Sequence, residues 1–422
     1  MLSGMTTDSK RSRRVATCAF SLFLVFAAAA APTLSWATPK VPLVHPVVFA
    51  HHPDGSSKPD DITTLGGLIY VTYQNDAGKD GTPVGSFSTI IAYDSTGRSV
   101  ATYTIPGRCD GLTADPTHNQ ILATANEDLN SSLFVITPGT VQPKHYTYSP
   151  DPAQTGSDGS NGGTDAISVT PSGTLYVAHS NPDPKLPAPN NAAAVYTMTL
   201  RGTTAQLKPL FGVNDPAVAI GAGSGPATPM GLTDPDSNQY LPALGGGTLI
   251  QGAQGDSKLV MATNLGSVKP TLKQLKLTNA ITPRHGAATP QVDDIVEVTG
   301  PGTLYAVDQG PSALVYAMDT SSITPGTFFA SQPAPSTGDL PNDPGLRVVD
   351  LTTGVVTPVA AGLISPKGLL FVPAANKTVS GSASDIKTST STTSRTGLYA
   401  GITLVVLVVI AAAFVLRRRR HA

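Results

Sequence analysis

Aspartate recurs at one position in several repeated segments of this chain, two residues or fewer before an aliphatic residue. The segments are Asp61-Ile62, Asp110-Gly-Leu112, Asp165-Ala-Ile167 and Asp294-Ile295, and the same pattern begins with another residue in Met230-Gly-Leu232 and Lys367-Gly-Leu369. Carboxylates that converge on one point, with amide oxygens nearby, suit a hard cation such as Ca²⁺. Like charges held close together otherwise raise one another's pKa. The chemistry therefore depends on whether the fold brings these positions together.

The elements around these positions are predicted to be β-strands. The runs 67–72, 173–178, 258–263 and 302–307 are short, similar and rich in β-branched and aromatic residues, and no long 3.6-residue period occurs. Such a recurring unit is typical of repeat folds. The six segment starts, 49, 55, 65, 64 and 73 residues apart, predict an all-β fold, a six-bladed β-propeller over residues 40–375. Seven blades are the alternative.

Closure of the ring and the place of two later runs are further expectations. The last unit lacks strands of its own, so residues 41–50 are predicted to complete it and to close the ring. The paired runs 346–351 and 355–360 are expected in either the last or the fifth blade.

In a propeller, the loop that enters the innermost strand and the loop after the second strand open on the same face. This geometry predicts a ring of polar side chains around one channel mouth. The candidate ligand-binding residues are Asp61, Asp110, Asp165, Asp294, Lys367 and Asn181, and the candidate metal ligands are Asp110, Asp165 and Asp294. The alternative is that each aspartate bonds neighbouring backbone N–H groups and shapes a turn. Lys367 can also neutralise an aspartate and remove the need for a metal.

Several strands resemble those of known propellers. Ile69-Tyr-Val-Thr72 before Asn75, Tyr176-Val-Ala178 with Asn181, and Met261-Ala-Thr-Asn264 resemble the Tyr-Val-Thr-Asn repeats of bacterial surface-layer propellers. The Gly-Leu strand starts are similar to those of the six-bladed NHL-repeat and gluconolactonase-like proteins. That resemblance implies a metal at the channel mouth that assists lactone hydrolysis. This chain departs from the pattern, with Asp61 where Glu is expected and Lys367 in the ring.

The two ends of the chain are predicted to export and anchor it. Residues 1–37 have basic, apolar and small-residue regions in the order of a cleaved secretory signal, the alternative being an uncleaved anchor. The run from Leu398 to Leu416 has no charged residue, and as a helix it rises about 28 Å, close to the hydrocarbon thickness of a bilayer. The arginines of the basic tail, residues 417–422, keep that end cytoplasmic. The Ser/Thr-rich residues 376–396 are typical of a stalk.

The charge balance and the cysteine content exclude some classes of partner and of stabilising bond. Between the signal and the basic tail, 19 basic residues face 27 acidic ones, an acidic balance that argues against nucleic acid as a partner. Cys109 is the single cysteine of that part, so no internal disulfide can form. The leading hypothesis is a single-pass cell-membrane protein whose extracellular propeller binds a protein, a glycan or a small ligand. The alternatives are a Ca²⁺-dependent lactonase-like hydrolase and a structural envelope protein.

Overall fold

The computed structural model describes residues 44–152, 162–183, 192–280, 289–333, 345–360 and 362–375. These ranges contain β-strands, two 3₁₀ turns (η1, Gly221–Gly223; η2, Leu244–Gly246) and no α-helix, so no helix in them is suited to crossing a membrane. Contacts divide the chain into two units, Met1–Ala374 and Ala375–Ala422, and all described strands belong to the first. The predicted signal, stalk, membrane span and basic tail lie outside the described residues.

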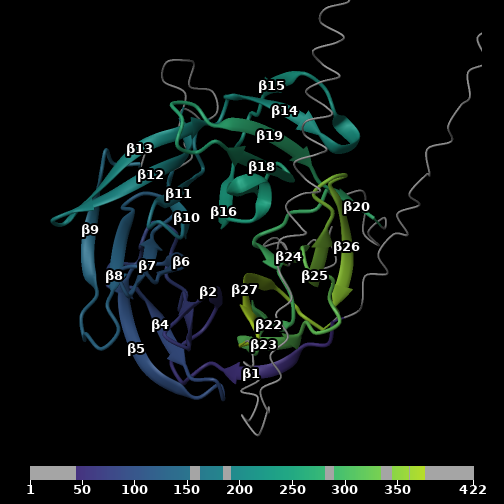
Figure 1. The fold of residues 1–422 in the computed structure, drawn as a ribbon. Coiled ribbons are helices and arrows are strands. Elements are labelled where there is room, and N and C mark those ends of the chain that lie inside the picture. Colours follow the sequence, from purple (N-terminus) through teal and green to yellow (C-terminus); the bar gives the residue numbers. More distant parts are fainter. Residues whose placement is uncertain are drawn as a thin grey trace, which may run out of the picture. The chain divides into compact units, whose positions relative to one another are not determined.

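The strands form five hydrogen-bonded sheets that surround a common centre (Figure 1), which confirms an all-β, propeller-like fold. The first sheet runs outward from the centre through strands β2 (Pro59–Leu65), β3 (Leu68–Tyr73), β4 (Phe87–Tyr93) and β5 (Ser99–Pro106).

The next sheet has eight strands in two antiparallel halves. One half contains β6 (Cys109–Asp115), β7 (Gln120–Ala125), β8 (Ser132–Ile136) and β9 (Lys144–Ser149). The other contains β10 (Gly163–Val169), β11 (Leu175–Ser180), β12 (Ala193–Arg201) and β13 (Thr204–Gly212). A short parallel pairing between the outer strands β9 and β13 joins the halves.

The third sheet is extended by an excursion of the chain at its outer edge. It runs from β16 (Pro235–Leu241) through β17 (Thr248–Ala253), β18 (Lys258–Thr263) and β19 (Thr271–Lys276) to β14 (Pro216–Ile220) and β15 (Ala227–Pro229). Strand β14 pairs parallel to β19, whereas the other pairings of this sheet are antiparallel.

The last two sheets exchange strands. The fourth contains β21 (Ile295–Val298), β24 (Thr327–Gln332), β25 (Gly345–Val349), β26 (Val355–Ala360) and β20 (Thr278–Asn279). The fifth contains β27 (Pro366–Pro373), β22 (Gly302–Asp308), β23 (Leu314–Asp319) and β1 (Val47–His51). The first and last strands therefore share one sheet, which confirms the predicted closure of the ring by both ends.

The predicted repeat treats each segment start as the opening of an inner strand and each of the runs 67–72, 173–178, 258–263 and 302–307 as the second strand of the same unit. Three of these assignments are wrong. The run 302–307 does not pair with the strand after Asp294 but with β27, because β22 crosses to the next sheet. The run 258–263 is a third strand, since β17 precedes it in the sheet. Met230 begins no inner strand. It is buried in an apolar cluster with Leu232, so Met230-Gly-Leu232 resembles the repeat in sequence only. The paired runs 346–351 and 355–360 lie in the sheet of β21, the strand after the fifth segment start Asp294, which agrees with the fifth-blade alternative.

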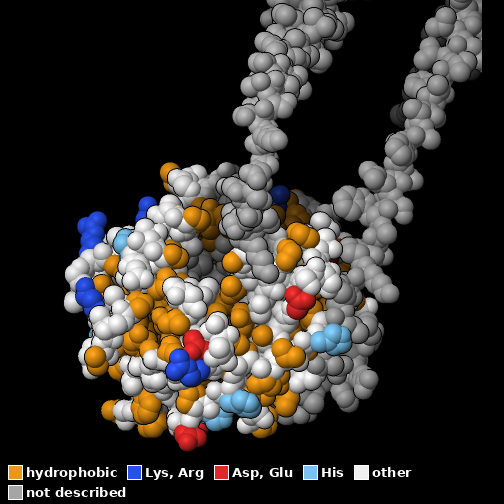
Figure 2. Space-filling view, turned by 60° about the horizontal axis from the view of Figure 1, so that its bottom comes forward, with side chains coloured by type: hydrophobic (Ala, Val, Ile, Leu, Met, Phe, Trp, Pro, Cys, Tyr) orange, Lys and Arg blue, Asp and Glu red, His pale blue; other side chains and the backbone are white. Residues whose placement is uncertain are grey.

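Apolar side chains fill the space between neighbouring sheets. Between the first sheet and the β6 half of the second, for example, Tyr70 and Ile90 pack with Ile121 and Ala123. Burial of each large apolar side chain contributes about 1.5–3 kcal/mol. On the face shown in Figure 2, by contrast, charged side chains occur singly or in small groups among uncharged and hydrophobic ones. Several aspartates lie instead at the centre of the ring, where they line a cavity.

Candidate functional site

A β-bulge near the start of the inner strands gives the site its shape. In β2, β6, β10, β16 and β27, two residues stand opposite one residue of the neighbouring strand, which interrupts the register. The hydroxyls of Thr72, Thr124 and Ser331 accept the backbone N–H of Asp61, Gly111 and Asp294, the second residue of each pair. A bulge changes the direction of its side chains. The same bulge recurs in five inner strands around the centre. The threonine of the Tyr-Val-Thr pattern therefore holds a bulge in place.

The first residue of each pair forms an acidic ring. The equivalent positions, aligned by the aliphatic residue or Asn238 that follows the bulge, hold Asp60, Asp110, Asp165, Asp236, Asp293 and Lys367. The five aspartates line a cavity of about 320 Å³ to which β2, β6, β10, β16, β21 and β27 all contribute. We name these five aspartates the channel ring.

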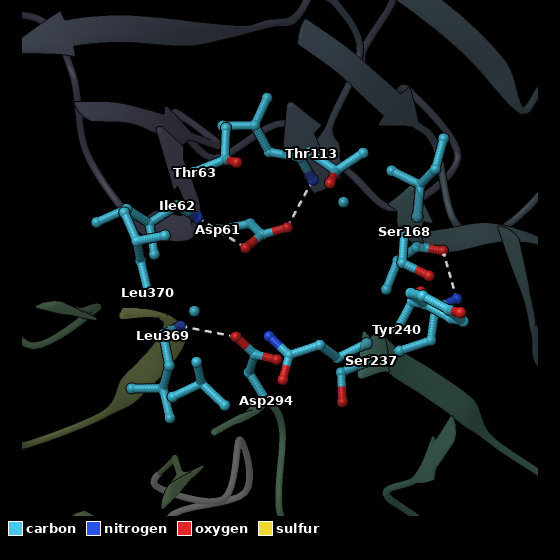
Figure 3. Close-up of a pocket in the computed structure, with 18 of the residues that line it drawn as sticks. Asp61, Ile62, Thr63, Thr113, Ser168, Ser237, Tyr240, Asp294, Leu369 and Leu370 are labelled. Atoms are coloured by element: carbon cyan, nitrogen blue, oxygen red, sulfur yellow. Dashed lines mark hydrogen bonds between the residues drawn. The ribbon is translucent and has the colours of Figure 1, made fainter. Parts of the chain in front are cut away.

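The second residue of each pair joins adjacent inner strands. The Asp61 carboxylate accepts the N–H of Ile62 and, across the gap between sheets, that of Leu112. Asp294 does the same for the N–H groups of Ile295 and Leu369, and Figure 3 shows the bond to Leu369. Glycine takes this position where the next backbone is too close for a side chain. A Cβ at Gly111 would lie 2.7 Å from the Asp165 carbonyl oxygen.

Replacement of Asp61 by asparagine is expected to destabilise the fold by about 1–3 kcal/mol, because the amide group has one acceptor oxygen for two buried N–H donors. Urea denaturation followed by circular dichroism measures the change. Asp54→Asn, at an exposed carboxylate, is the matched control and should shift the free energy of unfolding by less than about 0.5 kcal/mol. Equal effects of the two substitutions would contradict the joining role of Asp61.

Glutamines that directly follow the strands β3, β17 and β22 hold three members of the channel ring. Gln74 donates to Asp110 (2.7 Å), Gln254 donates to Asp293 (2.8 Å) and Gln309 donates to Asp60 (2.9 Å). In each case the glutamine lies on the sheet next to that of its aspartate. These bonds fix the carboxylates and connect the sheets at one end of the cavity.

Cations neutralise the ring unevenly. The Lys367 amine lies 2.6 Å from Asp293 and 4.0 Å from Asp60, and Arg108 lies 3.1 Å from Asp110. Glu127, beside the ring, pairs with Arg108 and with Lys79. Within the described part of the chain, no cation and no hydrogen-bond donor contacts the carboxylates of Asp165 and Asp236. The β10 and β16 side of the ring is therefore the electrostatically uncompensated one.

Burial raises the pKa of the ring carboxyls. For Asp60 burial outweighs the opposing charge of Lys367, and the pKa rises from 3.8 to about 7. Burial and then the repulsion of Glu127, Asp110 and Asp60 raise the pKa of Asp165 well above its ordinary value. Burial raises the pKa of Asp236 in the same way, with the charge of Asp165 the next cause. Burial alone would lower the pKa of Lys367, but the surrounding carboxylates raise it well above 10.5.

The structure brings five of the six residues proposed from the sequence to this centre. Asp110 and Asp165 are members of the channel ring, Asp61 and Asp294 also line the cavity but bond backbone N–H groups, and Lys367 pairs with Asp293. Asn181 does not line the cavity, and its amide donates to Asp128 at 2.8 Å. Whether any of them binds a ligand stays a prediction.

Sequence reasoning missed three ring members. Asp60 and Asp293 lie one residue before the predicted positions, and aligning every repeat on its aliphatic residue, as in Asp110-Gly-Leu112, would have found both. Asp236 offered no such signal because Asn238 replaces the aliphatic residue there. Its bulge is defined only by the pairing of β16 with β17.

The described residues provide no group of three or more His, Cys, Asp or Glu side chains arranged to hold a metal ion. The aspartates of the ring are distributed around the centre instead of converging on one point. The predicted Ca²⁺ site with Asp110, Asp165 and Asp294 is therefore a hypothesis without a coordination geometry in these ranges. Cys109 is buried, and burial raises the pKa of its thiol, so it is no accessible nucleophile.

No protein-family profile and no curated protein sequence matches the chain. Among solved structures, it is similar to a periplasmic gluconolactonase of Pseudomonas aeruginosa, at 11% identity over 78% of this chain and 99% of that one, with a TM-score of 0.44. A putative 6-phosphogluconolactonase of Bacteroides uniformis matches at 13% identity over 78% and 99%, TM-score 0.40. A GH43_1 enzyme of Xanthomonas citri matches at 10% identity over 77% and 97%, TM-score 0.40. Likenesses of this strength carry no argument about function.

Proposed function

We propose that this chain is a membrane-tethered, extracytoplasmic β-propeller of six blades that binds a small polar ligand in its central channel. Six inner strands line the cavity, each followed outward by further strands, which supports six blades although β9 and β13 join two of them into one sheet. The predicted signal, stalk and single span support the tether. The cavity, at about 320 Å³, is at the lower end of the usual range for ligand sites.

The observation on which this proposal rests is a set of unpartnered polar groups among the residues that line the cavity. Within the described residues, these buried oxygens have no hydrogen-bond partner: Asp110 Oδ2, Ser168 Oγ, Ser237 Oγ, Asn238 Oδ1 and Gln239 Oε1. Most buried polar groups are hydrogen-bonded, and an unsatisfied one costs about 1–3 kcal/mol. Five such atoms on residues that line one cavity, beside the carboxylates of Asp165 and Asp236 that have no partner among the described residues, favour a polar guest in this cavity.

A thermal-shift screen of the purified full-length protein against cationic, neutral and anionic polar compounds tests the proposal. We expect at least one compound to raise the melting temperature. Thr113 lines the cavity, so Thr113→Phe should fill part of it and abolish that shift while the fold, followed by circular dichroism, is retained. If no compound stabilises the protein, or if Thr113→Phe leaves the shift unchanged, the channel is not a ligand site and a structural envelope role is favoured.

A lactonase-like hydrolase is the second candidate, favoured by the pKa of Asp60. A carboxyl with a pKa of about 7 on the wall of a cavity is suited to general acid–base catalysis at neutral pH. A panel of lactones, assayed with Ca²⁺ and with a chelator, separates the candidates. Turnover that Asp60→Asn abolishes would support the hydrolase, and absence of turnover with both additions would exclude it for those substrates.

A further inference from the structure

The cavity wall differs from strand to strand. Of the described lining residues, β27 contributes Gly368, Leu369, Leu370 and Phe371, none of them polar, and β16 contributes Asp236, Ser237, Asn238 and Gln239 beside Tyr240 and Leu241. The strands β2, β6, β10 and β21 contribute both kinds, with Asp165 and Ser168 on β10. We call the β27 wall the apolar side and the β10 and β16 wall the polar side. Figure 3 shows Leu369 and Leu370 of β27 on one side of the cavity and Ser168, Ser237 and Tyr240 on the other. A ligand that satisfies both sides has a polar part and an apolar part.

The polar side presents acceptors. Five residues of the cavity wall have a buried oxygen without a hydrogen-bond partner among the described residues. The amide oxygens of Asn238 and Gln239 can only accept a hydrogen bond, and the same holds for the Asp110 carboxylate when it is ionised. The orientation of the Asn238 amide is fixed, because its nitrogen donates to the Ala166 carbonyl at 3.1 Å. The complementary ligand is therefore rich in N–H or O–H donors.

The same side also lacks positive charge. Asp165 is 6% exposed, lines the cavity and has neither a cation nor a donor on its carboxylate among the described residues. Asp236, the neighbouring ring member, is half-buried and also has neither on its carboxylate in these ranges. Lys367 and Arg108 are already engaged with Asp293 and Asp110. A buried carboxylate without a partner is costly, and an N–H donor of opposite charge forms the strongest hydrogen bond with it.

We propose that the channel binds a small organic cation rich in N–H donors, an alkylamine or alkylguanidine, with its charged head on Asp165 and Asp236 and its hydrocarbon part against the apolar side. This inference rests on the proposed function and names the class of its ligand. A polyatomic cation suits carboxylates that are distributed around a cavity, since its several N–H groups reach separate oxygens. A bare metal ion requires its ligands to converge, which the described residues do not provide.

The raised pKa values of Asp165 and Asp236 are consistent with a cation bound between them. Burial and mutual repulsion raise the pKa of both Asp165 and Asp236. A cation in contact with them favours their ionised forms, so binding should weaken as the pH falls and the carboxyls take up protons.

Calorimetric titration of the full-length protein at pH 8 with four probes tests the class of ligand. The probes n-butylamine and n-butylguanidine have charge and N–H donors, n-butanol has the same hydrocarbon chain without charge, and tetramethylammonium has charge without a donor. We expect the first two to bind and the last two to bind at least about tenfold more weakly, the effect of losing one charge-assisted hydrogen bond.

Variants locate the bound cation. Asp165→Asn and Asp236→Asn keep the side-chain shape and remove one charge each, and each should weaken n-butylamine about tenfold to a hundredfold. Asp319→Asn is the matched control, because Asp319 lies at the far end of its sheet from Lys367, level with Thr303 and Val372, and is exposed. It should leave the affinity unchanged.

The outcomes separate failure of the organic-cation inference from failure of the proposed function. Binding of n-butanol as tight as that of n-butylamine, or equal losses in Asp319→Asn and Asp165→Asn, overturns the organic-cation inference. If a neutral or anionic compound from the screen binds in the channel, as judged by Thr113→Phe, and the amine does not, the inference fails while the proposed function stands. Absence of any channel-dependent binding removes both.

Discussion

Lys367→Met is expected to destabilise the protein by about 3–5 kcal/mol at pH 8, the usual cost of removing one partner of a buried ion pair. The Lys367 amine lies 2.6 Å from Asp293 and 4.0 Å from Asp60, and its side chain is 20% exposed. Methionine has a similar length but no charge, so it leaves both carboxylates facing the other ring aspartates without compensation. Chemical denaturation measures the change in the free energy of unfolding.

The control for Lys367→Met is the same substitution in an exposed pair. Lys58 lies 2.6 Å from Asp76, but the two side chains are 52% and 70% exposed, so Lys58→Met should cost no more than about 1 kcal/mol. The double variant Lys367→Met with Asp293→Asn should regain part of the lost stability, because it removes the carboxylate left unpaired. If Lys367→Met costs no more than Lys58→Met, the balance of charge in the channel does not depend on this amine.

The second large effect concerns pH. Burial raises the pKa of Asp60 and of Asp294 from 3.8 to about 7, and it raises those of Asp110, Asp165 and Asp236 in the same direction. A carboxyl with a raised pKa in the folded state contributes stability while it is protonated, and this contribution is lost as the pH rises from about 4 through 7. We therefore expect the free energy of unfolding to be about 1–4 kcal/mol larger at pH 5.5 than at pH 8 in the absence of added ligand.

Asp165→Asn is the variant that tests the origin of this pH dependence. Asparagine removes a carboxyl that has no cation among the described residues, so the variant should be more stable than the native protein at pH 8 by about 1–2 kcal/mol and should show a smaller difference between pH 5.5 and pH 8. Denaturation curves of both proteins at the two pH values provide the comparison. A native protein that is more stable at pH 8 than at pH 5.5 would falsify the assignment of buried, repelling carboxyls.

The local features of this protein are largely a property of its sequence. Short β-branched runs separated by turns specify strands, and the recurrence of one pattern, as in Asp110-Gly-Leu112 and Lys367-Gly-Leu369, indicates a repeated unit with a polar residue at a constant place. The sequence alone also indicates that the first and last strands share a sheet, because the last repeat has too few strands of its own. These inferences succeed because strand propensity and alternation are decided by neighbouring residues.

The tertiary structure alone decides which residues meet. Strand pairing decides that β22 and β24 lie in different sheets. It also decides that a bulge places Asp236 in the channel ring, and that Asp60, not Asp61, is a member of that ring. A shift of one residue moves a side chain to the other face of its strand, so a small ambiguity in alignment exchanges a ring carboxylate for one that joins backbones. The recurring aspartates were visible in the sequence, but the division between compensated and uncompensated carboxylates follows from where the folded chain places Lys367 and Arg108.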